Sequence, residues 1–320
     1  MKRTTSAVDQ LPHFLPMGDA ALLVRWGDAI DLATNARVLA LLAALDRQPI
    51  AGVIDLVPAY ASLLVVFDPL RVAAAALRGG IGRRLARLAV SEPGVAESVV
   101  EIPVAYGGAA GPDLAAVAHE LGITPAEVVR RHTATEYRVY FLGFIAGFPY
   151  LGCAAPTLEV ARLATPRTQV PAGSVGLAGA QSGIYPQASP GGWRIIGRTT
   201  RRLFDPASDP PTLVQPGDRV RFTVRRGAAM PPTQETEAAS VGLPPTGAVP
   251  WLRVVAVGPG ATVQDGGRRG YGRYGVAASG AADREALCLG NALLGNPTDA
   301  AALELTLGGG IFAITAPCVI

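Results

Sequence analysis

Apolar residues along the first hundred positions recur with the periods of both strands and helices. Three short apolar runs have the length and composition of buried strands: residues 21–27, 61–67 and 98–108. Between the first two runs, Leu32, Leu39 and Leu42 lie near one stripe of an amphipathic helix, which is predicted over 31–48.

A second helix is predicted directly after the strand that ends near residue 67. Asp68 can serve as its N-cap, Pro69 suits its first helical position, and Gly79 and Gly80 are expected to end it. The resulting β-α-β-α-β order predicts a small α+β domain over residues 14–105.

Two short helices are predicted next, before the chain returns to strand alternation. Asp113 can cap the first helix, which is expected to end near Gly122. Thr124 and Glu127 form a capping box for the second helix, with Pro125 at its first position.

The rest of the chain is interpreted as two further β-rich parts and a linker. Residues 140–224 are short β-rich runs separated by glycine and proline, so a mainly-β barrel domain is predicted over 106–226. Residues 227–250 lack periodicity and indicate a linker. Residues 251–320 begin another β-rich domain with a helix near 282–294, and about 70 residues is short enough that we expect it to be incomplete.

Composition narrows the functional classes. The chain has 320 residues and a formal net charge of +3, which gives no reason to expect a nucleic-acid or membrane partner. Its cysteines, Cys153, Cys288 and Cys318, are far apart, which favours free thiols in a reducing compartment. The N-terminus has no apolar signal-peptide core, so a cytoplasmic protein is expected. The sequence contains no HExxH, CxxC or P-loop motif, so it indicates neither a metal hydrolase nor a P-loop ATPase.

Residues 170–193, VPAGSVGLAGAQSGIYPQASPGGW, form a long uncharged run rich in glycine and proline. Such a backbone can form short strands and tight turns, and its N–H groups suit an anion. Arg167, Arg194 and Arg198 flank the run and could add bidentate contacts. We therefore expect the run to line a cavity that binds a small anion, although ordinary barrel corners would have the same composition.

Two long motifs in this region carry a resemblance to a known family. Residues 136–152 (EYRVYFLGFIAGFPYLG) and 164–199 (ATPRTQ…RIIGRT), followed by LFDP and QPGDRVRF, closely resemble the KipI family. That family is also called allophanate hydrolase subunit 1, or the B subunit of bacterial 5-oxoprolinase. The resemblance covers about 14–225, and residues 254–296 resemble the start of the KipA family, or the C subunit of 5-oxoprolinase. The chain is thus similar to a fusion of the B subunit with the beginning of the C subunit.

The resemblance implies a cyclophilin-like β-barrel after the small α+β domain, and an incomplete second cyclophilin-like domain. It implies a component of an ATP-dependent 5-oxoprolinase, which converts 5-oxo-L-proline to L-glutamate. The family works with a separate A subunit that would supply the ATP chemistry. Without that subunit and the remainder of the C subunit, we expect this chain to be inactive. No metal is expected.

Candidate site residues follow from the family's motifs and from the uncharged run. His132 and Arg167 are the candidate catalytic residues. The candidate substrate-binding residues carry polar side chains in or near the run and in the C-terminal part: Tyr150, Ser174, Gln181, Tyr185, Arg194, Gln264, Asp265 and Arg268. A simple helix-end histidine, a structural salt bridge of Arg167 and barrel packing of Tyr150 stay open as alternatives.

Three other functions stay open. KipI-like proteins include an inhibitor of a histidine kinase, so the barrel could bind a kinase. The same pair of subunits forms the carboxyltransferase part of urea carboxylase, which would require biotin-bearing partners. Residues 113–132 also resemble a helix-turn-helix, but its second helix offers only Arg130 and Arg131 for phosphate contacts.

Overall fold

The computed structural model describes residues 11–88, 99–154, 157–225, 252–258, 260–306 and 308–314. It divides into two compact units, and each is described by itself. The first comprises residues 1–233 and 270–276, and the second comprises 234–269 and 277–320. The linker predicted over 227–250 lies outside the described residues.

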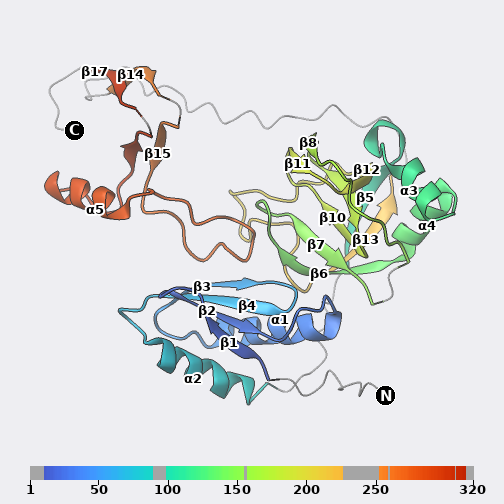
Figure 1. Cartoon of the computed structure of the whole chain (residues 1–320), viewed down its shortest axis with the longest axis horizontal. Helices are drawn as coiled ribbons and strands as arrows, with labels where there is room; N and C mark the ends of the chain where they lie inside the picture. Colours follow the sequence, from blue (N-terminus) through green and yellow to red (C-terminus); the bar gives the residue numbers. More distant parts are fainter. Residues whose placement is uncertain are drawn as a thin grey trace. The chain divides into compact units, whose positions relative to one another are not determined.

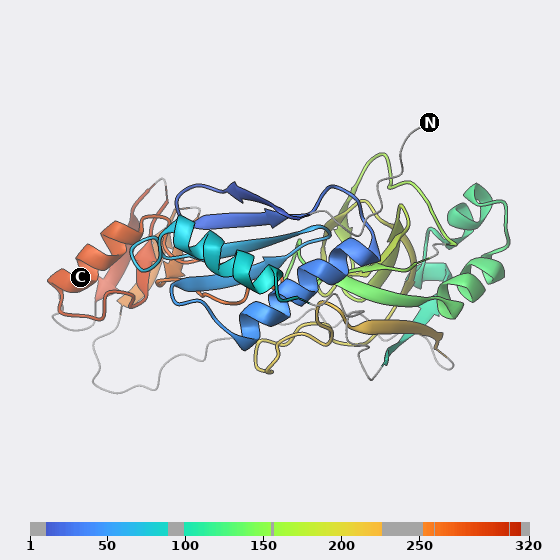
Figure 2. The ribbon, with the colours of Figure 1, turned by 90° about the horizontal axis from the view of Figure 1, so that it is seen from below.

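The first unit begins with a small α+β domain, a four-stranded antiparallel sheet with two helices on one face (Figure 1, Figure 2). The sheet order is β1-β2-β4-β3. Apolar residues at alternate strand positions pack against one stripe of the first helix, as the two periodicities predict. The elements are β1 (His13–Pro16), β2 (Ala21–Arg25), α1 (Leu32–Arg47), β3 (Val53–Pro58), β4 (Ser62–Phe67) and α2 (Ala74–Leu85).

Helix α2 differs from the prediction at both ends. The carboxylate of Asp68 accepts a hydrogen bond from Leu70 N (2.9 Å) and forms a turn, so the helix begins only after Ala73. The helix then continues through Gly79 and Gly80. A Cβ atom at Gly80 would lie 3.1 Å from Ile50 Cδ1, so a small residue lets this helix pack closely on its neighbour.

The barrel follows, with seven strands closed in the order β10-β7-β6-β13-β5-β12-β9 (Figure 1). This confirms the predicted mainly-β barrel. Closure removes the exposed strand edges that an open sheet would leave. The elements are β5 (Val99–Tyr106), η1 (Gly108–Ala110), α3 (Leu114–Glu120), α4 (Pro125–Ala134), β6 (Glu136–Leu142), β7 (Pro149–Gly152), β8 (Arg167–Val170), β9 (Ser174–Ala178), β10 (Gln181–Ile184), β11 (Ser189–Gly191), β12 (Arg194–Arg198) and β13 (Arg219–Val224).

Strand β5 is a barrel strand, although the sequence places it at the end of the small domain over 14–105. It pairs in parallel with β13 along its length and antiparallel with β12. The apolar alternation of β5 indicates that the strand is buried. It does not indicate which sheet buries it, because that depends on a partner more than a hundred residues away.

Helices α3 and α4 pack on the barrel, and their N-termini differ. Thr124 Oγ1 accepts a hydrogen bond from Glu127 N (3.1 Å), which confirms Thr124 as the N-cap of α4. The Glu127 carboxylate, the other half of the predicted capping box, accepts from Arg130 and Arg131 instead. Asp113 makes no side-chain cap for α3. Its carboxylate instead accepts from Ile195 N on β12 (2.6 Å).

The described part of the second unit holds two antiparallel strand pairs and one helix. Strand β14 pairs with β17, and β15 pairs with β16. Helix α5 lies within the predicted range and begins at the N-cap Asp283. The bounds are β14 (Leu252–Val257), β15 (Thr262–Gln264), α5 (Arg284–Leu293), β16 (Ala302–Glu304) and β17 (Gly310–Ile314). Among the described residues, no helix combines the length and the apolar character that a membrane span needs.

Candidate functional site

The first unit contains a cavity of about 700 Å³ between the N-terminus of α1 and the barrel. The barrel side is formed by β6, the end of β7 and the hairpin between β9 and β10. This volume lies within the range of small-molecule sites. The polar side chains of the lining are Asp31, Tyr140, Glu159, Arg162 and Gln181.

A buried amide holds α1 against the barrel and so fixes one wall of the cavity. Asn35 Nδ2 lies 3.1 Å from Ala59 O, 3.2 Å from Tyr60 O and 3.3 Å from Tyr140 O. The last contact joins the small domain to β6 of the barrel. Asp31 caps the same helix through its Oδ1, which accepts from Thr34 N at 2.8 Å.

The β9–β10 hairpin forms the opposite wall. Ala178 pairs with Gln181 across a two-residue turn, and Gly179 takes the positive φ of +56° that such turns favour. Gly179 also exchanges backbone hydrogen bonds with Val160, at 2.7 and 3.2 Å. Those bonds hold the segment that carries Glu159 and Arg162 against the hairpin.

Gln181 supplies a hydrogen-bond donor without a partner. Its Oε1 accepts from the Tyr60 hydroxyl at 2.9 Å. Its Nε2 is buried and has no hydrogen-bond partner within the described part of the chain. A buried unpaired donor costs about 1–3 kcal/mol, so an acceptor on a ligand would stabilise this amide.

Arg162 supplies the positive charge of the cavity. Its guanidinium carbon lies 5.8 Å from the centre of the Trp193 ring, a cation–π contact. It has no ion-pair partner among the residues that the structure describes. Burial raises the pKa of Tyr60 and Tyr150, and the nearby Arg162 charge acts against that rise. The cavity therefore combines one cation with the carboxylates of Asp31 and Glu159.

The predicted catalytic residue His132 lies in the barrel core and does not line this cavity. Its Nδ1 is 2.7 Å from the Tyr106 hydroxyl and its Nε2 is 3.0 Å from Ser182 Oγ. Ser182 Oγ donates onward to Gly176 O (3.3 Å), which suits a neutral ring that donates from Nε2. Burial lowers the pKa of His132 to about 3. This geometry favours a structural histidine.

Arg167, the other predicted catalytic residue, is held away from the cavity by an ion pair. Its Nη2 is 2.7 Å from Asp113 Oδ1, and its buried Nη1 has no partner among the described residues. Arg194 makes a similar contact, with Nη2 at 3.2 Å from Glu120 Oε2. The structural salt bridge that the sequence left open for Arg167 is therefore observed.

The remaining predicted residues are dispersed. Tyr150 stacks on Phe141 with ring centres 4.5 Å apart. Ser174 and Tyr185 are almost fully buried in the barrel. The other three belong to the second unit and are Gln264, Asp265 and Arg268. Only Gln181 of the predicted set lines the cavity.

The structure corrects one expectation about the uncharged run 170–193, namely that its backbone amides bind a small anion. Its amides are used largely in strand and turn pairing, as in Gly173 N to Tyr185 O (2.7 Å), and do not converge on an anion. Aromatic packing explains two of its glycines. A Cβ at Gly183 would lie 2.8 Å from Phe148 Cζ, and one at Gly191 would clash with the Tyr185 hydroxyl.

Sequence reasoning missed Asp31, Glu159 and Arg162. Asp31 has the residue type of an N-cap ahead of an apolar helix, so its role as the cap of that helix can be predicted from the sequence, but its place in the cavity cannot. Glu159 and Arg162 lie in irregular chain with no periodicity. Nothing in the sequence shows that these residues line one cavity, because the lining combines the start of α1 with stretches of the chain more than a hundred residues later.

Comparisons with known proteins agree with this architecture. A solved structure of the protein TTHA0988 superposes with a TM-score of 0.77 at 39% sequence identity. The match covers 92% of this chain and 57% of that one. The 5-oxoprolinase B subunit of Bacillus subtilis is 42% identical over 216 residues, which are 64% of this chain and 90% of that protein.

The C-terminal part matches a different protein. The 5-oxoprolinase C subunit of Escherichia coli is 47% identical over 57 residues, 18% of this chain and 18% of that protein. The family profile "Carboxyltransferase domain, subdomain A and B" matches residues 274–320. The profile "Carboxyltransferase domain, subdomain C and D" matches residues 12–214, more than half of the chain. The chain therefore belongs to the family of carboxyltransferase domains, subdomains C and D.

Proposed function

We propose that this chain is a component of a 5-oxoprolinase and that its cavity binds the lactam. The observation that carries the proposal is the presence, in one cavity, of an arginine without an ion pair and a buried, unsatisfied amide donor among the described residues. Relatives at 42 to 54% identity are named as the B subunit of 5-oxoprolinase. These names favour 5-oxoprolinase over a kinase inhibitor or a urea carboxylase.

The substrate's chemistry fits these groups. 5-Oxoproline has a carboxylate and, on the same small ring, an amide with one acceptor and one donor. Arg162 can bind the carboxylate through two parallel hydrogen bonds. Gln181 Nε2 can donate to the lactam oxygen, and a carboxylate of Asp31 or Glu159 can accept from the ring N–H.

ATP does not fit the same cavity. Its lining offers one arginine against the two carboxylates of Asp31 and Glu159, and a triphosphate would be repelled by them. Opening an unactivated lactam to glutamate is unfavourable without ATP. We therefore assign the ATP chemistry to a separate A subunit, and this chain binds and orients the lactam.

The binding site is tested by the Arg162→Gln substitution. Removing the guanidinium should weaken 5-oxoproline binding about tenfold or more, because a charge-assisted hydrogen bond contributes about 1.5–3 kcal/mol. Isothermal titration calorimetry measures this directly, with pyrrolidone, which lacks the carboxylate, as the control ligand.

Arg201→Gln is the matched protein control, since Arg201 is exposed and lies outside the cavity. It should bind 5-oxoproline as the unaltered chain does. Equal affinity of the Arg162→Gln and Arg201→Gln chains would reject this cavity as the lactam site.

A further inference from the structure

Seven residues that follow strand β15 in the C-terminal part, Gly270–Val276, belong to the first unit. They form a compact turn through their own backbone: Tyr274 N donates to Tyr271 O and Gly275 N donates to Gly272 O, both at 3.0 Å. The turn is therefore ordered by local hydrogen bonds before any side chain is considered.

An ion pair fixes the turn to helix α1. The two terminal nitrogens of Arg273 lie 2.8 and 2.9 Å from the two carboxylate oxygens of Asp46. This parallel, two-bond geometry is the strongest arrangement of an arginine with a carboxylate. The Arg273 side chain is only 22% exposed, so the pair is partly shielded from solvent.

A second carboxylate of the small domain fixes the backbone of the turn. Gly272 N donates to Asp55 Oδ2 at 3.0 Å. A Cβ atom at position 272 would lie 2.6 Å from Val57 Cγ2 and 2.8 Å from that same carboxylate oxygen. Only glycine can approach β3 this closely.

The other half of the turn contacts the barrel. Gly147 N donates to Tyr274 O at 2.8 Å, and the Tyr274 side chain packs against the barrel core. Gly275 has a φ of +73°, and a Cβ there would lie 2.9 Å from Ile145 O. Four consecutive residues, Gly-Arg-Tyr-Gly, are thus each specified by a contact on the small domain or on the barrel.

We propose that Asp46, Asp55 and the β6–β7 loop at Gly147 form a docking site for a Gly-Arg-Tyr-Gly turn. In this chain the turn docks in cis. The 5-oxoprolinase B subunit of Bacillus subtilis and C subunit of Escherichia coli, which the two parts of the chain match, are separate proteins. The partner that fits this surface is therefore a second polypeptide that carries the same turn, and it binds in competition with the covalently attached one.

The proposal is tested on the full chain by hydrogen exchange at the Gly147 amide. Arg273→Glu places two carboxylates together and should displace the turn, so Gly147 should exchange about tenfold faster. Arg269→Glu makes the same charge change at an exposed neighbouring position and should leave this exchange rate unaltered. The double variant Asp46→Arg/Arg273→Glu, which reverses the pair, should restore slow exchange.

Binding in trans is tested by adding a synthetic peptide, GYGRYGV, to the Arg273→Glu chain at millimolar concentration. Because Asp46 is unchanged in that chain, the peptide should restore protection at Gly147, whereas a peptide with Glu in place of Arg should not. The proposal is overturned if Arg273→Glu leaves Gly147 exchange unchanged, if the reversed pair fails to restore it, or if the peptide gives no protection.

Discussion

His132 shows how far a single buried residue can differ from its expected role. Its ring stacks on Phe222 with centres 4.3 Å apart and is hydrogen-bonded at both nitrogens, to Tyr106 and Ser182. These two partners lie on β5 and β10, which are not neighbours in the barrel. The histidine therefore cross-links the barrel interior as a neutral group, because burial disfavours its charged form.

This neutral state predicts a loss of stability in acid. Above pH 6.5 the ring is uncharged in both the folded and the unfolded chain. Below pH 6.5 the unfolded chain binds a proton that the folded chain, with a pKa of about 3, does not bind. Lowering the pH from 7 to 5 should therefore reduce the free energy of unfolding by about 2 kcal/mol through this group alone. Urea unfolding at both pH values should show that loss in the unaltered chain.

His132→Gln should remove most of this pH-dependent difference, even if the variant is less stable at pH 7. His119→Gln is the matched control, because His119 lies exposed on α3. An unaltered pH dependence in the His132→Gln chain would refute the assignment of a neutral buried imidazole.

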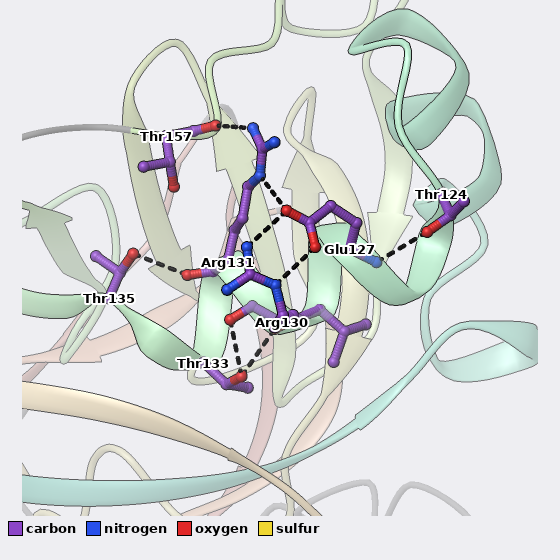
Figure 3. A network of polar contacts seen from close by, with 8 residues as sticks. Thr124, Glu127, Arg130, Arg131, Thr133, Thr135 and Thr157 are labelled. Atoms are coloured by element: carbon purple, nitrogen blue, oxygen red, sulfur yellow. Dashed lines mark hydrogen bonds and ion pairs between the residues drawn. The ribbon is translucent and has the colours of Figure 1, made fainter.

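Helix α4 illustrates how an element can be specified locally. Glu127 Oε2 and Oε1 accept from Arg130 and Arg131 at 2.6 and 2.7 Å, one turn along the helix (Figure 3). Arg131 also reaches Thr157 O at 3.4 Å. Both guanidiniums are thus engaged within the protein, which disfavours the helix-turn-helix alternative that relied on them for phosphate contacts.

The N-cap of this helix gives a prediction at the element scale. Thr124→Ala removes the acceptor for Glu127 N and should lower the free energy of unfolding by about 1 kcal/mol. Urea denaturation followed by circular dichroism measures the change. Thr133→Ala is the control on the same helix, since the Thr133 hydroxyl only bonds back to carbonyls that the helix already uses. An equal or larger loss in Thr133→Ala would argue against the capping role.

At the scale of the whole molecule, the chain combines parts that the matched 5-oxoprolinase B and C subunits carry on separate proteins. Residues before the predicted linker match the B subunit of 5-oxoprolinase, and those after it match the C subunit. The matched part is 18% of the Escherichia coli C subunit.

We predict that the purified chain with ATP forms no glutamate from 5-oxoproline, because the cavity that we propose for the lactam has two carboxylates that would repel a triphosphate. Adding an A subunit together with a complete C subunit should give ATP-dependent glutamate formation, measured with glutamate dehydrogenase. The same mixture with the Arg162→Gln chain is the control and should be slower. Glutamate formation by the chain alone would contradict this division of roles.

The sequence by itself determined the local elements and the family. The helix over 31–48, the Thr124 cap and the glycine-spaced barrel strands follow from periods and residue types that act within a few positions. The motifs in 136–199 identified the family, which the comparisons confirm. These features can be predicted without knowing which residues distant in the chain contact one another.

Only the tertiary structure decided what those elements surround. It placed β5 in the barrel through its parallel pairing with β13, and it buried His132 while engaging Arg167 with Asp113. It also brought Asp31, Arg162 and Gln181 to one cavity, although Asp31 is more than a hundred residues from the other two. The reason is physical: side-chain burial and long-range pairing are set by which surfaces the folded chain brings together, and no local pattern encodes that choice.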